Sequence, residues 1–272
     1  MGNGVLSVPL TNSSNGSEDV GSLLLDYPDI TSSRLMHSNR LFKVVQGTTD
    51  MKGPILVKLF IRRDSFSLDQ YRDDISLSKA ALSFELQPNV CTYERVDYKE
   101  KSACLIRHYF SSSLFDRLHG RPFLSSIQLK WIAFQLIAGV CQLHSLCIPH
   151  GDLKTENVML TSWLQAFLVD MTSFKPVYLP DWDTQAFTFF FESENRRKCY
   201  LAPERFYSGG LPQTNTKTTH HRFSMDIFSM GCTLAELFLE GVDVLDLPQV
   251  LKMRSLETER LPAELESLLK RI

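Results

Sequence analysis

The stretch His150-Gly151-Asp152-Leu153-Lys154-Thr155-Glu156-Asn157 decides the fold class, because it brings carboxylate, amide and ammonium side chains into one short loop. An apolar β-type run at 157–160 follows the loop, and a second run at 166–169 leads into Asp170. Transfer of a phosphoryl group requires such residues, since divalent cations must neutralise the phosphates and these cations prefer oxygen ligands. We therefore expect Asn157 and Asp170 to hold metal ions in a phosphoryl-transfer site.

Three further roles complete the site that this pattern predicts. Asp152 would orient the attacking hydroxyl and accept its proton, and Lys154 would stabilise charge on the transferred group. Lys58 lies inside an upstream β-type run, and it would bind the nucleotide together with Asn157 and Asp170. The expected cofactors are Mg²⁺ and ATP, with the nucleotide base left open between adenine and guanine.

The order of the patterned segments predicts an α+β protein with two lobes and a cleft between them. The first third holds β-type runs at 41–45, 55–61 and 103–109, and a polar helical stretch at 68–83. The remainder carries amphipathic segments at 125–146, 224–240, 247–254 and 262–271. We place a flexible, weakly packing leader at 1–29, a β-rich lobe at 30–108 and a helical lobe at 109–272. The core-facing stripes of the two long helices are expected to include Ile137 and Ile227.

Composition and charge exclude several classes of protein. The chain is 43% apolar and 22% charged with a net charge of −2, which is typical of a soluble globular protein. So balanced a charge provides no field to hold a polyanion, and we expect no nucleic-acid partner. No secretory signal is present, which favours the cytosol. The uncharged run 131–149 has helical periodicity and contains glutamines, which favours a buried helix over a membrane span.

Lys58, the loop from Asp152 to Asn157, and Asp170 stand in the order and at the spacing of the protein-kinase signature. Ala202-Pro203-Glu204 stands where the activation segment of a kinase ends. From about residue 30 onward the chain therefore resembles protein kinases. The resemblance implies support roles for four residues: His150 positions the loop, Asp226 bonds to its backbone, Asp74 (or Asp73) pairs with Lys58, and Glu204 matches a buried glutamate of kinases. In kinases that glutamate pairs with an arginine of a late helix, and this chain stops before that helix would be complete.

Three departures from the kinase pattern bear on activity. No glycine lies between Gly21 and Gly47, whereas a kinase covers the phosphates with a glycine-rich loop whose backbone N–H groups approach them closely. Gly151 replaces an arginine that often reads an activation-loop phosphate, and Met171 follows Asp170 in place of phenylalanine. We expect nucleotide binding to be better preserved than efficient turnover.

A narrower resemblance rests on segments that are unusual in ordinary kinases: Met1–Asn3, Arg121–Leu124, Trp131–Gln135, His150–Met159, Ser173–Pro176, Tyr178–Pro180 and Arg196–Phe206. They resemble the kinase-like regulatory subunit of the class III phosphatidylinositol 3-kinase complex. This resemblance implies a role in autophagy and in endosome-to-vacuole or lysosome sorting. The implied partners are the lipid kinase catalytic subunit and its autophagy and endosomal adaptor subunits. An acyl chain (myristate) on Gly2 and a cytoplasmic location, peripheral on endosomal and autophagic membranes, are also implied.

Two alternatives to a protein serine/threonine kinase stay open: a catalytically dead pseudokinase scaffold, and a lipid-anchored adaptor. The chain ends at Ile272, before the last helix of a kinase lobe would be complete, so we expect a fragment, a truncated gene model or a short isoform with an incomplete C-lobe. The basic run 196–198 is expected to be a solvated surface. The phenylalanines of 187–191 are expected to pack locally or against a partner.

Overall fold

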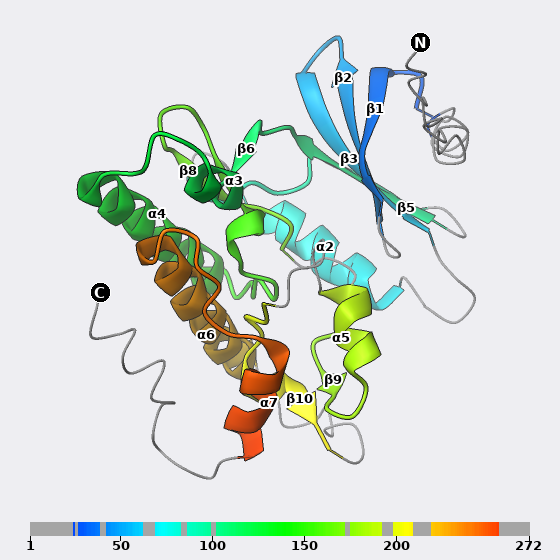
Figure 1. Ribbon diagram of the computed structural model, residues 1–272. Helices are drawn as coiled ribbons and strands as arrows, with labels where there is room; N and C mark the ends of the chain where they lie inside the picture. The colour runs from blue at the N-terminus through cyan, green and yellow to red at the C-terminus, as the bar shows by residue number, and fades with distance from the viewer. Residues whose placement is uncertain are drawn as a thin grey trace, which may run out of the picture.

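The computed structural model describes Leu24 and residues 27–38, 42–61, 69–82, 86–98, 102–171, 175–191, 198–208 and 219–255. These residues form a smaller lobe built on a sheet and a larger, mostly helical lobe (Figure 1). The α+β class and the two-lobed arrangement predicted from the sequence are confirmed.

The smaller lobe is a five-stranded antiparallel sheet with the strand order β1-β2-β3-β5-β4. Its strands are β1 Ile30–Ser38, β2 Phe42–Thr49, β3 Gly53–Ile61, β4 Arg95–Tyr98 and β5 Ser102–His108. One helix, α2 Asp69–Ala81, belongs to this lobe. The sequence predicted α2 and three of the strands. It missed β1 and β4, because β1 is rich in serine and β4 is only four residues long.

The alternation of side chains along β3 places Lys58 on the face that carries α2. Val57 and Leu59 point to one side of the sheet, where they join a buried apolar cluster. Phe60 points to the other side and packs in the same cluster as Ile75 of α2. Successive residues of a strand alternate between faces, so Lys58 shares the face of Phe60.

The end of the expected leader is part of the core. Leu24 and Tyr27 are only 8% and 4% exposed, and they pack in one cluster with Val45 and Val57 of the sheet. The sequence analysis assigned both residues to a weakly packing leader, and for them this was wrong. Their apolar side chains cover the sheet face opposite α2, which would otherwise meet solvent.

The larger lobe is built from five helices and several short strands within the described residues. The helices are α3 Leu114–His119, α4 Ser126–Ser145, α5 Thr184–Phe190, α6 Thr219–Phe238 and α7 Leu247–Ser255. The strands β6 Ser112–Ser113, β7 Val158–Leu160 and β8 Ala166–Leu168 form one small sheet, and β9 Leu179–Pro180 pairs with β10 Phe206–Tyr207. Two 3₁₀ turns span Thr155–Asn157 and Pro203–Arg205. The predicted segment 262–271 lies outside the described residues.

Helix α4 is the centre of this lobe. Ser125 and Gln128 form a capping box that satisfies the free N–H groups at its start. The helix packs so closely on β8 that a Cβ on Gly139 would lie 2.9 Å from Leu168 Cδ1. Most of the predicted stripe is buried, but Ile137 is 43% exposed. It follows the buried Leu136 and so lies about 100° farther round the helix.

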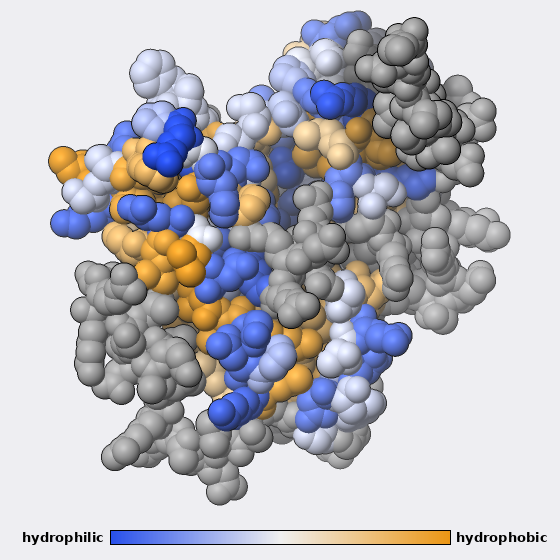
Figure 2. Space-filling model, viewed as in Figure 1, coloured by the Kyte–Doolittle hydropathy of each residue, from blue (hydrophilic) through white to orange (hydrophobic). Residues whose placement is uncertain are grey.

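The surface of the helical lobe carries apolar side chains. Figure 2 shows hydrophobic residues gathered on this face of the lobe, over α4 and α6. Ile227 of α6, predicted to face the core, is 50% exposed, because its neighbour Asp226 takes the inward position. No helix in the described part of the chain is long and apolar enough to cross a membrane.

Candidate active site

The carboxylate of Asp170, a residue of the larger lobe, contacts side chains of the smaller lobe. Asp170 lies two residues beyond the end of β8, and the intervening Val169 donates a backbone hydrogen bond of 3.0 Å to the carbonyl of Asn157. Lys58 reaches across from β3, and its Nζ lies 2.5 Å from Asp170 Oδ2. The structure therefore brings together the three residues that the sequence predicted to bind a nucleotide.

Two residues that the sequence analysis missed also hold Asp170. Arg107, at the end of β5, donates from Nε to Asp170 Oδ1 over 3.1 Å, and Tyr93 donates its hydroxyl to the same oxygen over 3.1 Å. Arg107 is 2% exposed and Tyr93 is 3% exposed. The available signal was the position of Arg107, a charged residue directly after the apolar run 103–106.

The pKa values reflect this cluster of charges. Burial alone would raise the pKa of Asp170, but Arg107 and Lys58 lower it far below its ordinary value. Burial lowers the pKa of Lys58, although Asp170 opposes the effect. Burial raises the pKa of Tyr93, and the neighbouring Asp170 raises it further. Asp170 is thus a carboxylate at neutral pH and Tyr93 is a neutral donor.

Asp152 forms the second acidic centre, on the loop before β7. Asn157 donates its amide N–H groups to Asp152 O over 2.7 Å and to Asp152 Oδ2 over 2.9 Å. Lys175 Nζ lies 2.6 Å from the same Oδ2, and Lys154 Nζ lies 4.0 Å from it. Burial would raise the pKa of Asp152, but Lys154 and Lys175 lower it to about 2. Lys175 is a further residue whose place in this site the sequence analysis missed.

Helix α5 closes one side of this centre. Lys154 donates to the carbonyl of Phe191 at the end of α5 over 3.3 Å. Phe187 and Phe191 are buried in one cluster with Tyr200. Phe190 lies at the edge of this cluster and also contacts the apolar cluster of the sheet lobe. The phenylalanines therefore pack within the chain, and through them α5 contacts both lobes.

The loop that carries Asp152 is held by hydrogen bonds from behind. Asp226 of α6 accepts from the backbone N–H groups of His150 and Gly151 over 2.7 and 2.8 Å. Gly151 has a φ of 78°, a conformation that glycine adopts without a steric penalty. Arg205 donates to the carbonyl of Gly151 over 2.6 Å. His150 is 2% exposed, and burial lowers its pKa, so it is a neutral core residue at pH 7.

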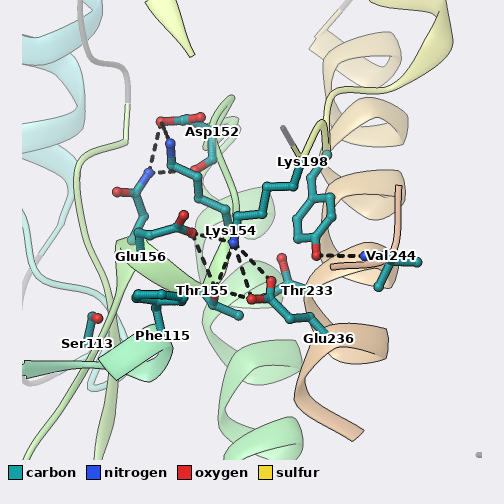
Figure 3. Close-up of polar contacts among 12 residues, drawn as sticks. Ser113, Phe115, Asp152, Lys154, Thr155, Glu156, Lys198, Thr233, Glu236 and Val244 are labelled. Carbon is teal, nitrogen blue, oxygen red and sulfur yellow. Dashed lines mark hydrogen bonds and ion pairs between the residues drawn. The ribbon is translucent and has the colours of Figure 1, made fainter. Parts of the chain in front are cut away.

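Lys198 corrects another expectation, because it is not on a solvated surface. Its Nζ lies 2.7 Å from Glu156 and 3.0 Å from Glu236, and it donates to Thr155 Oγ1 over 3.0 Å (Figure 3). Its side chain is 5% exposed. One ammonium thus neutralises two carboxylates and ties the segment before residues 202–204 to the catalytic loop. A small pocket lined by Asp152, Lys154 and Lys198 opens beside this group.

Of three further predicted residues, the structure describes only the side chain of Glu204. Glu204 is only partly buried and forms no ion pair with any of the described residues, whereas the matching glutamate of kinases is buried. Asp74 lies in α2, but its side chain is outside the described part of the structure, and the alternative Asp73 is exposed. Gly2 lies outside the described residues.

The side chains present suit a Mg²⁺ ion by their chemistry. Asn157 uses its amide nitrogen toward Asp152, so the oxygen of the same amide stays available as a metal ligand. Asp170 supplies carboxylate oxygens, which now accept hydrogen bonds from Lys58, Arg107 and Tyr93. Among the described residues no group of three His, Cys, Asp or Glu side chains could hold a metal. An ion here would need phosphate or water oxygens to complete its shell.

Comparison with known proteins agrees with this geometry. The family of protein kinase domains matches residues 43–252 of the chain. The chain therefore belongs to the protein kinase family.

Within this family the chain is similar to one group of kinases. It is 42% identical over 228 residues to "Serine/threonine-protein kinase VPS15" of Arabidopsis thaliana, which covers 83% of this chain and 15% of the relative. It is 40% identical over 224 residues to the protein of that name from Saccharomyces cerevisiae, with 81% and 15% covered. A more distant kinase, ssn3 of Aspergillus niger, is 24% identical over 211 residues, with 73% and 45% covered. The chain thus carries a VPS15-like kinase domain, and the matched region is about 15% of the length of the VPS15 relatives.

Proposed function

We propose that this chain is the kinase-like part of the regulatory subunit of a class III phosphatidylinositol 3-kinase complex, and that its cleft binds a Mg-nucleotide. The proposal extends to autophagy and endosome-to-vacuole or lysosome sorting, with the lipid kinase catalytic subunit and its adaptor subunits as partners. The observation that carries nucleotide binding is the 2.5 Å contact between Lys58 and Asp170 beside Asn157. The similarity to VPS15 kinases supports the role in the complex.

The residues of the cleft would divide the work as follows. Asn157 and Asp170 would hold Mg²⁺, which supplies neutralising charge to the phosphates when it is bound. Lys58 would bind phosphate oxygens, because its ion pair with Asp170 holds the ammonium beside the expected metal ligands. Asp152 would orient the hydroxyl of a protein serine or threonine and accept its proton. Lys154 would face the charge that develops on the transferred group.

A second candidate is a pseudokinase scaffold in which the nucleotide is structural. Two observations favour it over an efficient kinase. The proposed base Asp152 already has an ion pair with Lys175, and its pKa is lowered to about 2, so it is a weak base. Both oxygens of Asp170 already accept hydrogen bonds from side chains of the sheet lobe. We rank nucleotide binding above catalytic turnover for these reasons.

Thermal denaturation with Mg²⁺ and either ATP or GTP tests nucleotide binding. We expect a rise in melting temperature for the wild type and no rise for Lys58→Met. The matched control is Lys130→Met, which removes a lysine from the exposed side of α4 and should respond like the wild type. A wild type that neither nucleotide stabilises would contradict nucleotide binding in this cleft.

Transfer of labelled phosphate separates the kinase from the scaffold. Asp152→Asn keeps the shape of the side chain and removes the base, so a kinase should lose transfer to a protein acceptor while it still binds nucleotide. Equal background transfer by the wild type and the variant would exclude the enzyme and leave the scaffold.

Anchoring at Gly2 is a separate part of the proposal. An acyl chain there would place the protein in the cytoplasm, peripheral on endosomal and autophagic membranes, although one myristoyl chain binds membranes only marginally. Intact mass of the chain isolated from eukaryotic cells shows whether the modification is present. Gly2→Ala should remove it and reduce recovery with membranes, and an unmodified wild-type mass would contradict this part.

A further inference from the structure

An additional ammonium group lies in the cleft, and the proposed function does not use it. Lys175 belongs to the segment that follows Asp170, and its Nζ lies 2.6 Å from Asp152 Oδ2. The side chain is 16% exposed, and the ammonium lies 5.0 Å from the centre of the Phe191 ring. Lys175 is therefore a cation at the rim of the buried centre, and it contacts the carboxylate that faces the expected acceptor.

Charged groups surround Lys175 from several elements. Burial lowers its pKa to about 8; Asp152 opposes this effect, whereas Lys154 and Lys58 lower the pKa further. The site brings the side chains of three lysines, Lys58, Lys154 and Lys175, into the vicinity of the two carboxylates, and Arg107 adds a further positive charge at Asp170. Glu156 and Glu236 lie farther along the catalytic loop, where they share Lys198. The excess of cations suits a polyanion such as a nucleoside triphosphate.

The sheet lobe gives a reason why such a cation is needed. In a kinase a glycine-rich loop covers the phosphates, whereas in this chain, whose strands β1 and β2 lie within residues 30–49, no glycine lies between Gly21 and Gly47. Any residue other than glycine carries a Cβ atom, which keeps the backbone N–H groups farther from a phosphate. Cationic side chains must then supply the contacts. Lys154 donates to the backbone carbonyl of Phe191. Lys175 instead donates to the carboxylate of Asp152, the residue expected to face the acceptor hydroxyl.

We propose that Lys175 binds the terminal phosphate of the nucleotide, and that it exchanges its ion pair with Asp152 for one with that phosphate. The proposal rests on the proposed nucleotide binding. Without a nucleotide, Lys175 holds the Asp152 carboxylate and keeps it a weak base. With a triphosphate present, the ammonium moves to the terminal phosphate and Asp152 becomes accessible to a hydroxyl.

Equilibrium binding of triphosphate and diphosphate tests this assignment. The probes are ATP and ADP with Mg²⁺, with GTP and GDP in parallel, titrated against the full chain by calorimetry. Lys175→Met should weaken triphosphate binding by about tenfold, which corresponds to one charge-assisted hydrogen bond, and should leave diphosphate binding within about twofold. Lys175→Arg should keep the preference for the triphosphate, and the control Lys130→Met should change neither affinity.

Each other outcome has a definite meaning. Equal weakening of triphosphate and diphosphate binding by Lys175→Met would make Lys175 a structural residue and overturn the assignment. Tighter triphosphate binding by the same variant would show that Lys175 obstructs the phosphate site, and it would also overturn the assignment. A wild type that binds neither nucleotide would overturn the proposed function itself, and with it the role of Lys175.

The partner of Lys175 provides an independent readout. Asp152→Asn removes the carboxylate that competes with the phosphate for Lys175, so we expect this variant to bind the triphosphate more tightly than the wild type does. The gain should disappear in the double variant Asp152→Asn with Lys175→Met. A gain of the same size with and without Lys175 would contradict the exchange of partners.

Discussion

Asp170 and Asp152 are both buried carboxylates of one cleft, but their partners differ in kind. Asp170 is held by Lys58, Arg107 and Tyr93, three groups that come from the sheet lobe and its connections. Asp152 is held by a neighbouring amide and by lysines of its own lobe, on flexible stems. The buried guanidinium of Arg107 is a planar group with a fixed position, and we call it a fixed support of Asp170. Lys175 lies at the rim on a flexible side chain, so its ammonium can change its partner more easily. The contrast indicates that Asp170 joins the lobes, while Asp152 is ready to change its partner.

The largest effect is expected when the fixed support is removed. Arg107→Met leaves the buried carboxylate of Asp170 without its guanidinium, and we expect a loss of about 3–5 kcal/mol in the free energy of unfolding. Denaturation in urea measures this loss. The matched control is Arg95→Met, because Arg95 pairs with Asp29 and Asp97 at an exposed site, where the loss should stay below about 1 kcal/mol. Equal losses for the two variants would remove the distinction between the two regions.

An intermediate effect is expected from acid. Asp152 has a pKa of about 2 in the folded chain against an ordinary 3.8, so its charge stabilises the fold fully above the ordinary value. That stabilisation is lost as the pH falls through about 2, and it amounts to about 2 kcal/mol. Unfolding free energies at about pH 5 and about pH 2 should therefore fall more steeply for the wild type than for Asp152→Asn. Parallel pH dependence would show that the lysines do not hold this carboxylate.

The smallest effect is expected when the exchangeable cation is removed. Lys175→Met removes a half-buried charge together with its own desolvation penalty, whereas the carboxylate of Asp152 stays buried. Asp152 keeps Asn157 and Lys154 as neighbours. We expect the unfolding free energy to change by less than about 1 kcal/mol. A loss as large as that of Arg107→Met would place Lys175 among the fixed supports.

Local patterns carried a large part of the prediction. The hairpin of β2 and β3 and the helix α4 follow from the spacing of apolar residues and from a capping box, which act over a few residues. The order and spacing of Lys58, Asp152, Asn157 and Asp170 match the protein-kinase signature, and this match led to the prediction that the four residues form one site. The strand β1 was not predicted, because its serines interrupt the alternation of apolar and polar residues that is typical of a strand.

The partners of the charged residues were the harder part. Lys175 looks like an ordinary surface cation in the sequence, Arg107 offered only its position after an apolar run as a signal, and Lys198 was assigned to a solvated surface. Arg107 and Lys198 are buried and Lys175 is half-buried, and each lies against a carboxylate that no short-range pattern connects to it. The contact between Lys175 and the ring of Phe191 is likewise not predicted by any local pattern, because the two residues lie far apart in the sequence.

By itself, the amino-acid sequence determined the kinds of elements, the α+β class, and the candidate residues of the cleft, because periodicity, caps and motif spacing are local properties. Only the tertiary structure decided which cation faces which carboxylate. Lys58 and Asp170 are 112 residues apart, and Arg107 and Asp170 are 63 apart. Such pairs form when packing brings two lobes together and burial makes each unpaired charge costly, and neither condition can be read from a short stretch of sequence.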